Sequence, residues 1–317
     1  MPLNGLAARS AAPVAQQPGF AGAFARFYQR SYAPDYIALG VLIAGWLLIQ
    51  AFVTPFHRMF SLDNKAIQYP FAEVERVPVV MSVIYAGFIP FVILLLWAAM
   101  FQPGTHKAQV TILGLFISLM LTSFITDIIK NAVGRPRPDL ISRCKPARGT
   151  PQNTLVAYSV CTQPDAHIFQ EGWRSFPSGH SSFSFAGLGY FFLFLSGQMH
   201  VFRPRTDLGR CLLALVPLLG AAMVACSRLA DYRHDVYDVT CGSVLGFLVA
   251  YFSYRRYYPH LRSVRCDVPY DKADLVTPED FGRLPDDEER QFGLLSRTYD
   301  GTDDTYQLDE AANTRGR

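Results

Sequence analysis

The chain has 317 residues, half of them hydrophobic, and a formal net charge of +3. This charge is too small to indicate nucleic-acid binding, and no basic run interleaved with aromatic residues supports it. Composition alone allows either one large soluble domain or a protein that crosses a membrane several times. The distribution of the apolar residues decides between these two classes.

The apolar residues are concentrated in blocks of about 18 to 24 residues, the length that a helix needs to cross about 30 Å of hydrocarbon. Most of the blocks lack the regular polar face of a helix in a soluble protein. The sequence therefore predicts an all-α, polytopic membrane protein with six transmembrane helices. We place them at residues 36–53, 78–101, 108–129, 182–202, 211–227 and 236–254.

The two ends of the chain differ in composition from this membrane domain, residues 36–258. Residues 1–35 are rich in Ala, Pro, Gln and Gly and show no apolar periodicity, so we expect a disordered arm. Residues 259–317 become acidic and polar, which predicts a disordered tail. The first apolar block is long enough to span, which favours an uncleaved anchor over a signal peptide.

The placement of Lys and Arg predicts the orientation, because these residues favour the cytoplasmic side near the ends of spans. Basic residues fill the short loop after the fourth span and follow the sixth, which puts both termini in the cytoplasm. The segment 135–174 is also basic, but this orientation places it on the non-cytoplasmic side, so it is an exception to the rule. The same segment holds Cys144 and Cys161, which could pair if that side is oxidising. The link 56–77 carries mixed charge and no recognised chemistry.

The stretch KNAVGRPRP, residues 130–138, follows the third span. Its prolines stop the helix and extend the chain, which lets Lys130 and Arg137 approach one anion. The alternative is the usual one for basic residues at a helix end, in which Lys130 reaches the interface and Arg137 contacts lipid headgroups.

The stretch FPSGH, residues 176–180, precedes the fourth span. A Ser-Gly turn that opens a helix exposes backbone N–H groups, which together with the helix dipole can bind phosphate oxygens. Ser178 and Gly179 would form this cradle, with His180 at its edge. The alternative is an ordinary helix N-cap made by Ser178 or Ser181.

The stretch SRLADYRHDVYD, residues 227–238, joins the fifth and sixth spans. It places Arg228, His234 and Asp238 where hydrocarbon depth makes charged groups costly. His234 and Asp238 are four residues apart, so we expect both on one helical face, where a carboxylate fixes the tautomer of the imidazole. The alternative is a buried ion pair with a structural role.

The order of the spans brings the three stretches together. The first lies where a span exits, the second where the next span enters, and the third bridges an exit and an entry. All three therefore fall on one side of the membrane, whatever its orientation, and together they predict a single anion-binding site.

The three stretches resemble the Lys-x6-Arg-Pro, Pro-Ser-Gly-His and Ser-Arg-x5-His-x3-Asp motifs of the phosphatidic acid phosphatase type 2 superfamily, in the same order. The longer sequences around two of these motifs, EGWRSFPSGHSS and KNAVGRPRPDLISRC, are similar to those of the lipid phosphate phosphatase and diacylglycerol pyrophosphate phosphatase branch of this superfamily. The resemblance covers the membrane domain and excludes the arm and tail.

This resemblance implies a role for each motif residue. His234 would attack phosphorus and form a phosphohistidine, Asp238 would hold its ring, and His180 would protonate the departing oxygen and then activate water. The phosphoryl oxygens would be bound by Lys130, Arg137, Ser178, Gly179 and Arg228. The sequence has no clustered carboxylates of the kind that hold Mg²⁺, so we expect no metal and no cofactor.

The implied substrates are membrane lipids, namely phosphatidate, lysophosphatidate or diacylglycerol pyrophosphate. Isoprenoid diphosphates and sphingoid base phosphates stay open as alternatives, as do a lipid phosphotransferase and a non-catalytic binder or transporter of anionic lipid. The orientation predicts a site on the luminal, extracellular or vacuolar side. The sequence leaves open whether the chain forms a homo-oligomer.

Overall fold

The computed structural model describes residues 19–20, 28 and 31–270, so nearly all of the predicted arm and most of the predicted tail lie outside the described residues. The chain forms two compact units. All described helices belong to the first, residues 1–262 and 266–269. The second unit, residues 263–265 and 270–317, lies almost wholly outside the described residues.

The described chain is helical, as predicted, and contains no β-strand between residues 31 and 270. The long helices are α2 (Ala33–Phe52), α5 (Thr105–Val133), α8 (Gly179–Gln198), α9 (Leu208–Ala230), α10 (Val236–Arg255) and the continuous helix Val79–Phe101. This last helix is made up of α3 (Val79–Val83), the π-helical η3 (Ile84–Phe88) and α4 (Ile89–Phe101). Short elements are η2 (Lys65–Ile67), α6 (Leu140–Cys144), η4 (Tyr158–Val160) and α7 (Ala166–Glu171).

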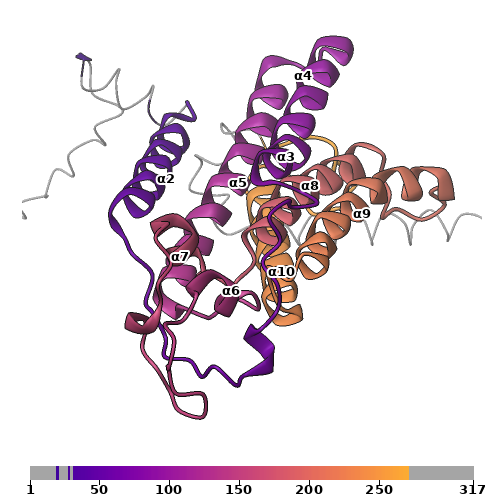
Figure 1. Cartoon of the computed structure of the whole chain (residues 1–317). Coiled ribbons are helices and arrows are strands. Elements are labelled where there is room, and N and C mark those ends of the chain that lie inside the picture. The colour runs from indigo at the N-terminus through magenta and orange to yellow at the C-terminus, as the bar shows by residue number, and fades with distance from the viewer. Residues whose placement is uncertain (1–18, 21–27, 29–30, 271–317) are drawn as a thin grey trace, which may run out of the picture. The chain divides into compact units, whose positions relative to one another are not determined.

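Among the residues that the structure describes, five helices are long and apolar enough to cross a membrane: α2, the continuous helix Val79–Phe101, α5, α9 and α10. The predicted fourth span forms α8, which has 20 residues but is not among these five. Most of its residues are buried, because α8 packs against α5, α9 and α10 (Figure 1). A helix that faces protein on most sides needs less apolar surface than one that faces lipid.

Small residues let α8 and α10 pack closely. A Cβ added to Gly246 of α10 would lie 2.1 Å from the carbonyl oxygen of Ser182 on α8. No side chain fits at that distance, so glycine sets the separation of the two helices. The contact matters for the site, because Ser182 follows the FPSGH turn and α10 follows His234.

We expect Gly246→Ala to force α8 and α10 apart and to lower stability by about 1–3 kcal/mol, the usual cost of overpacking. The measurement is thermal unfolding of the purified protein in detergent micelles. Gly40→Ala on α2 is the matched control, because nothing lies within 4 Å of a Cβ there. Equal melting temperatures for the two variants would contradict the close packing of α8 on α10.

The helix α5, which corresponds to the third predicted span and carries the start of the first motif, ends one turn later than predicted. Its last residue is Val133, and Gly134 closes it with a left-handed backbone at φ 57°. A Cβ at Gly134 would overlap the carbonyl oxygen of Phe56, which leaves room only for glycine. Lys130 therefore lies in the last helical turn, and the chain turns away at Arg135.

A small cap of loops and short helices follows α5. Leu140 of α6, Phe60 and Trp173 are buried in its own apolar core, and the indole N–H of Trp173 donates to the carbonyl oxygen of Arg58 at 2.9 Å. A disulfide joins Cys144 to Cys161 across the cap. Figure 1 shows α6 and α7 together near one end of α5. The cap therefore fixes the chain between the first two motifs.

The predicted boundary between membrane domain and tail at residue 259 is too early. Cys266 is fully buried, and its thiol lies 3.4 Å from the carbonyl oxygen of Gly197 on α8. The side-chain amide of Gln198 donates to the carbonyl oxygen of Asp267. The chain therefore still packs on α8 beyond residue 259, which the change to polar composition did not indicate.

Candidate active site

One cavity of about 940 Å³ brings the three motifs together. Its lining includes the motif residues Lys130, Arg137, Gly179, His180, Arg228 and His234. Ser178 and Asp238, two further predicted site residues, are fully buried and do not line it. The three motifs therefore meet in one cavity, as expected from topology, while Ser178 and Asp238 lie behind the residues that line it.

His234 lies just before α10, whose N-cap is Asp235, and not on the helix as expected. Its Nδ1 is 2.8 Å from the carbonyl oxygen of Ser175. A carbonyl oxygen only accepts hydrogen bonds, so Nδ1 carries the proton and the lone pair is on Nε2. This is the tautomer that a nucleophilic imidazole needs.

The surroundings of His234 also favour its neutral form. Burial lowers the pKa of this imidazole well below its usual value, and the positive charges of Arg137 and Lys130 lower it further. The ring therefore keeps its lone pair throughout the neutral pH range. A protonated imidazole could not attack phosphorus.

Asp238 does not hydrogen-bond His234 directly, which corrects the expected pairing. The distance from Oδ2 to Nδ1 is 3.8 Å, too long for a hydrogen bond. Instead Oδ2 accepts from the Ser175 hydroxyl at 2.6 Å and from the backbone N–H of Asp235 at 3.0 Å, and Oδ1 accepts from Arg135 at 2.8 Å. Asp238 thus holds Ser175, and the carbonyl of Ser175 holds the imidazole.

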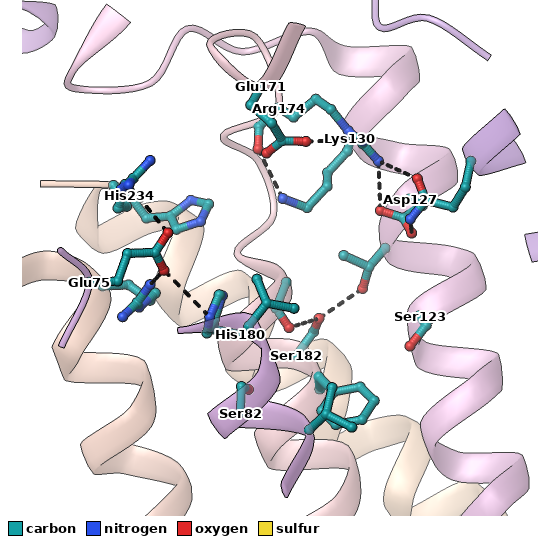
Figure 2. Close-up of a pocket in the computed structure, with 18 of the residues that line it drawn as sticks. Glu75, Ser82, Ser123, Asp127, Lys130, Glu171, Arg174, His180, Ser182 and His234 are labelled. Atoms are coloured by element: carbon teal, nitrogen blue, oxygen red, sulfur yellow. Dashed lines mark hydrogen bonds and ion pairs between the residues drawn. The ribbon is translucent and has the colours of Figure 1, made fainter. Parts of the chain in front are cut away.

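Two predicted cations are fixed by the segment before the FPSGH turn. The ammonium of Lys130 donates to the carbonyl oxygen of Arg174 at 2.9 Å, and Arg137 pairs with the carboxylate of Glu171 at 2.6 Å. Burial raises the pKa of Glu171, but Arg137, Lys130 and Arg174 outweigh it and lower this pKa to about 2. Glu171 is therefore a permanent anion that anchors cations beside the cavity (Figure 2).

A second carboxylate, Asp127, lies one turn before Lys130 and was missed as a site residue. It accepts from Arg174 at 3.0 Å and from the indole of Trp46 on α2 at 2.7 Å. Figure 2 shows Asp127, Arg174 and Lys130 grouped at one end of the cavity. Its sequence position did hold a signal, because an ionisable residue inside an apolar span is a candidate for function.

The FPSGH turn opens α8 and combines both readings of that motif. Ser178 is the N-cap and accepts from the backbone N–H of Ser181, so it caps the helix and is not placed to contact phosphate directly. Gly179 and His180 follow and line the cavity. A Cβ at Gly179 would lie 3.5 Å from Cε of Lys130, so the first turn of α8 packs against that cation.

Arg228 lies in the last turn of α9 and is almost fully buried. One side of its guanidinium donates to Asp231 at 3.0 Å and the other to Glu75 at 2.7 Å. Glu75 belongs to the link 56–77, in which we expected no chemistry. Nothing in that link indicated a partner 153 residues away. His180 is near the same carboxylate, with Nε2 4.0 Å from Oε2.

Comparison with known proteins decides the family. Residues 111–262 match the model of the PAP2 superfamily. A protein of Schizosaccharomyces pombe named probable diacylglycerol pyrophosphate phosphatase 1 is 38% identical over 242 residues, which cover 76% of this chain and 86% of the relative. The chain belongs to the PAP2 superfamily. The family and the enzyme predicted from the three motifs are thereby confirmed.

Two further relatives support membership of the PAP2 superfamily. Diacylglycerol pyrophosphate phosphatase 1 of Saccharomyces cerevisiae is 40% identical, with 74% of this chain and 83% of the relative covered. Lipid phosphate phosphatase 2 of Arabidopsis thaliana is 36% identical, with 73% and 78% covered. No solved structure matches the chain.

The cavity of this PAP2 superfamily member is polar at one end and apolar at the other. Beyond His180 its lining is mostly apolar, with the hydroxyl side chains of Ser82 and Ser123 among the apolar groups (Figure 2). The apolar residues come from three helical segments: Val83, Gly87, Phe88 and Phe91 of the helix Val79–Phe101, Phe116, Leu119 and Met120 of α5, and Phe183 of α8. Cations at one end and aromatic and aliphatic groups at the other fit an amphiphile with an anionic headgroup.

The described part of this PAP2 superfamily site offers little to a metal ion. No group of three or more His, Cys, Asp or Glu side chains among residues 31–270 is arranged to hold one. The carboxylates next to the cavity, Glu75, Asp127 and Glu171, are each paired with arginine.

Proposed function

We propose that the chain is an integral membrane lipid phosphatase that removes phosphate from phosphatidate, lysophosphatidate or diacylglycerol pyrophosphate. The observation that carries this proposal is the continuity of one cavity from the motif cations and histidines to an apolar groove. A lipid could place its phosphate among the cations while its chains stay in the groove. The relatives described above are named diacylglycerol pyrophosphate phosphatase and lipid phosphate phosphatase, and these names support the same assignment.

The proposed mechanism uses His234 as the nucleophile. Its Nε2 attacks phosphorus, the bond from phosphorus to the leaving oxygen breaks, and His180 supplies a proton to that oxygen. Water then attacks the phosphohistidine, His180 accepts the proton of the water, and the phosphorus–nitrogen bond breaks to release phosphate. Lys130, Arg137 and Arg228 hold the oxygens whose charge increases in each transition state.

We also propose that α8 is a sixth span, which puts both termini in the cytoplasm and the site on the luminal, extracellular or vacuolar side. The disulfide between Cys144 and Cys161 supports this orientation, because disulfides persist in oxidising compartments. The cap that carries it is continuous with Arg137 and Glu171, so the cap and the site share one side. Homo-oligomerisation stays open.

The experiment that tests the function uses purified full-length protein in detergent micelles. The substrates are phosphatidate, lysophosphatidate, diacylglycerol pyrophosphate, an isoprenoid diphosphate and a sphingoid base phosphate, each labelled in its terminal phosphate. We expect free phosphate from the glycerolipids. Transfer of the label to a second lipid would support a phosphotransferase, and no release from any lipid would support a binder or transporter.

We expect turnover to need no divalent metal, because three fixed cations can supply the charge stabilisation that a metal supplies elsewhere. The measurement is the rate of phosphate release in excess EDTA, which should stay within about twofold of the untreated rate. A loss of activity that added Mg²⁺ restores would contradict this part of the proposal.

A further inference from the structure

The carboxylate of Glu75 bridges two arginines, Arg228 and Arg233, in the cavity. Glu75 accepts from Arg228 at 2.7 Å through Oε2, and its Oε1 is 3.2 Å from Nη2 of Arg233. Arg233 lies outside the recognised motif residues, lines the same cavity and is 8% exposed. Two guanidinium groups that share one carboxylate mark a position built for a two-oxygen anion.

This position lies next to His180, which we propose as the acid for the leaving group. Oε2 of Glu75 is 4.0 Å from Nε2 of His180, and that nitrogen is buried without a hydrogen-bond partner. Figure 2 shows Glu75 directed at His180. The two arginines are therefore on the side of the site where the departing oxygen would be protonated.

Arg233 is held in place by contacts that leave it facing the cavity. Its guanidinium stacks on the ring of Phe71 at 4.4 Å, Nη2 donates to the carbonyl oxygen of Ala72, and Nη1 is 3.9 Å from Asp139. Its Nε is buried and has no partner. A fixed guanidinium with spare donors can bind a further anion without reorganising.

We propose that Arg233, together with Arg228, forms a second anion subsite, which binds the phosphoryl group that stays with the lipid, and that Glu75 occupies this subsite in the empty enzyme. Arg228 keeps its contact with the transferred phosphoryl group and bridges the two, so Arg233 is the cation specific to the subsite. The inference rests on the proposed function and predicts that, within its substrate class, lipid diphosphates are preferred to lipid monophosphates. In the reaction, Nε2 of His234 bonds to the terminal phosphorus as the bond from that phosphorus to the bridging oxygen breaks. The electron pair stays on the bridging oxygen of the lipid monophosphate.

The subsite explains why cations lie on the leaving-group side. The leaving group of a diphosphate is itself a phosphate, whose charge two arginines can offset. The leaving group of a monoester is an alcohol oxygen, which needs a proton from His180 but no second pair of cations. Bound phosphate and the carboxylate of Glu75 would repel each other, so the substrate must displace Glu75 from both arginines.

The test measures binding and turnover of full-length protein in detergent micelles. Titration calorimetry with inorganic pyrophosphate and with orthophosphate, carried out for every variant in the inactive His234→Gln background, reports the subsite without turnover. We expect Arg233→Gln to weaken pyrophosphate binding about 10- to 100-fold, the loss of one charge-assisted contact, and to change orthophosphate binding less than about threefold. Turnover of diacylglycerol pyrophosphate should fall in the same ratio relative to phosphatidate with the same acyl chains.

Two further variants separate binding from structure. Arg76 ties the same segment to Asp231 at 2.6 Å without lining the cavity, so Arg76→Gln should leave the ratio of pyrophosphate to orthophosphate affinity unchanged. Glu75→Gln removes the competing carboxylate and should tighten pyrophosphate binding about tenfold. This arm still tests the proposal if Arg233→Gln does not fold.

Several outcomes would overturn the subsite. These are an equal loss of both anions in Arg233→Gln, the same change in Arg76→Gln, or weaker pyrophosphate binding in Glu75→Gln. Failure of the proposed function looks different, because wild-type protein would then release phosphate from no lipid. The calorimetric ratio would still decide whether the subsite exists.

Discussion

Replacing His234 with glutamine should reduce phosphate release by at least about 10⁴-fold, because the amide cannot form a phosphorus–nitrogen bond that water then hydrolyses. The ring is buried at the junction of α9 and α10, with Nδ1 bound to the carbonyl of Ser175 and Nε2 left for phosphorus. The measurement is the initial rate of phosphate release from labelled lipid in micelles.

The control for this variant is His106→Gln. His106 lies at the opposite end of α5 from Lys130 and contacts the hydroxyl of Tyr32, outside the cavity lining. Its replacement should change the rate less than about threefold. Substantial turnover by His234→Gln, with a melting temperature equal to that of the wild type, would show that another group attacks phosphorus.

Asp238→Asn should lower kcat about 100-fold while the KM for lipid stays within about threefold. The carboxylate of Asp238 does not line the cavity, so its loss removes no contact with the substrate. It positions the imidazole of His234 through Ser175, so its loss should displace the ring slightly. Misplacement of a reacting group by about 1 Å can cost this much. The measurement is steady-state kinetics with a lipid phosphate in micelles.

A double-mutant cycle with Arg135→Gln extends this prediction. Arg135 donates to Asp238 at 2.8 Å, so the two changes should be non-additive in kcat. Asp235→Asn is the matched control, because it breaks a half-exposed ion pair with the same arginine and keeps a good N-cap residue. If Asp235→Asn lowers kcat as much as Asp238→Asn, the carboxylate of Asp238 does not position the imidazole.

The convergence of the three motifs could be predicted because it depends on topology alone. Span exits and entries alternate between the two faces of a membrane, and this fixes the side of Lys130, His180 and His234 before any side chain is placed. The length of each apolar block likewise predicted the helices that carry them. The block at residues 182–202 predicted α8 in the same way, but α8 is not among the helices apolar enough to span, because most of its surface faces protein.

The partners of the motif residues could not be predicted in the same way. Glu75 reaches Arg228 from an irregular link, where no periodicity fixes the direction of a side chain. The spacing of His234 and Asp238 suggested a shared helical face, but the N-cap at Asp235 puts His234 before the helix. A shift of one residue at a helix start changes which groups meet, and sequence places such boundaries poorly.

The most direct test of the account is to trap the covalent intermediate. Wild-type protein is mixed with lipid labelled in its terminal phosphate, quenched in alkali within one turnover and digested for mass spectrometry. We predict a phosphoryl group on the imidazole of His234, stable to alkali, labile to acid and absent from His234→Gln. Label on any other residue, or full turnover with no labelled protein at any quench time, would contradict the account.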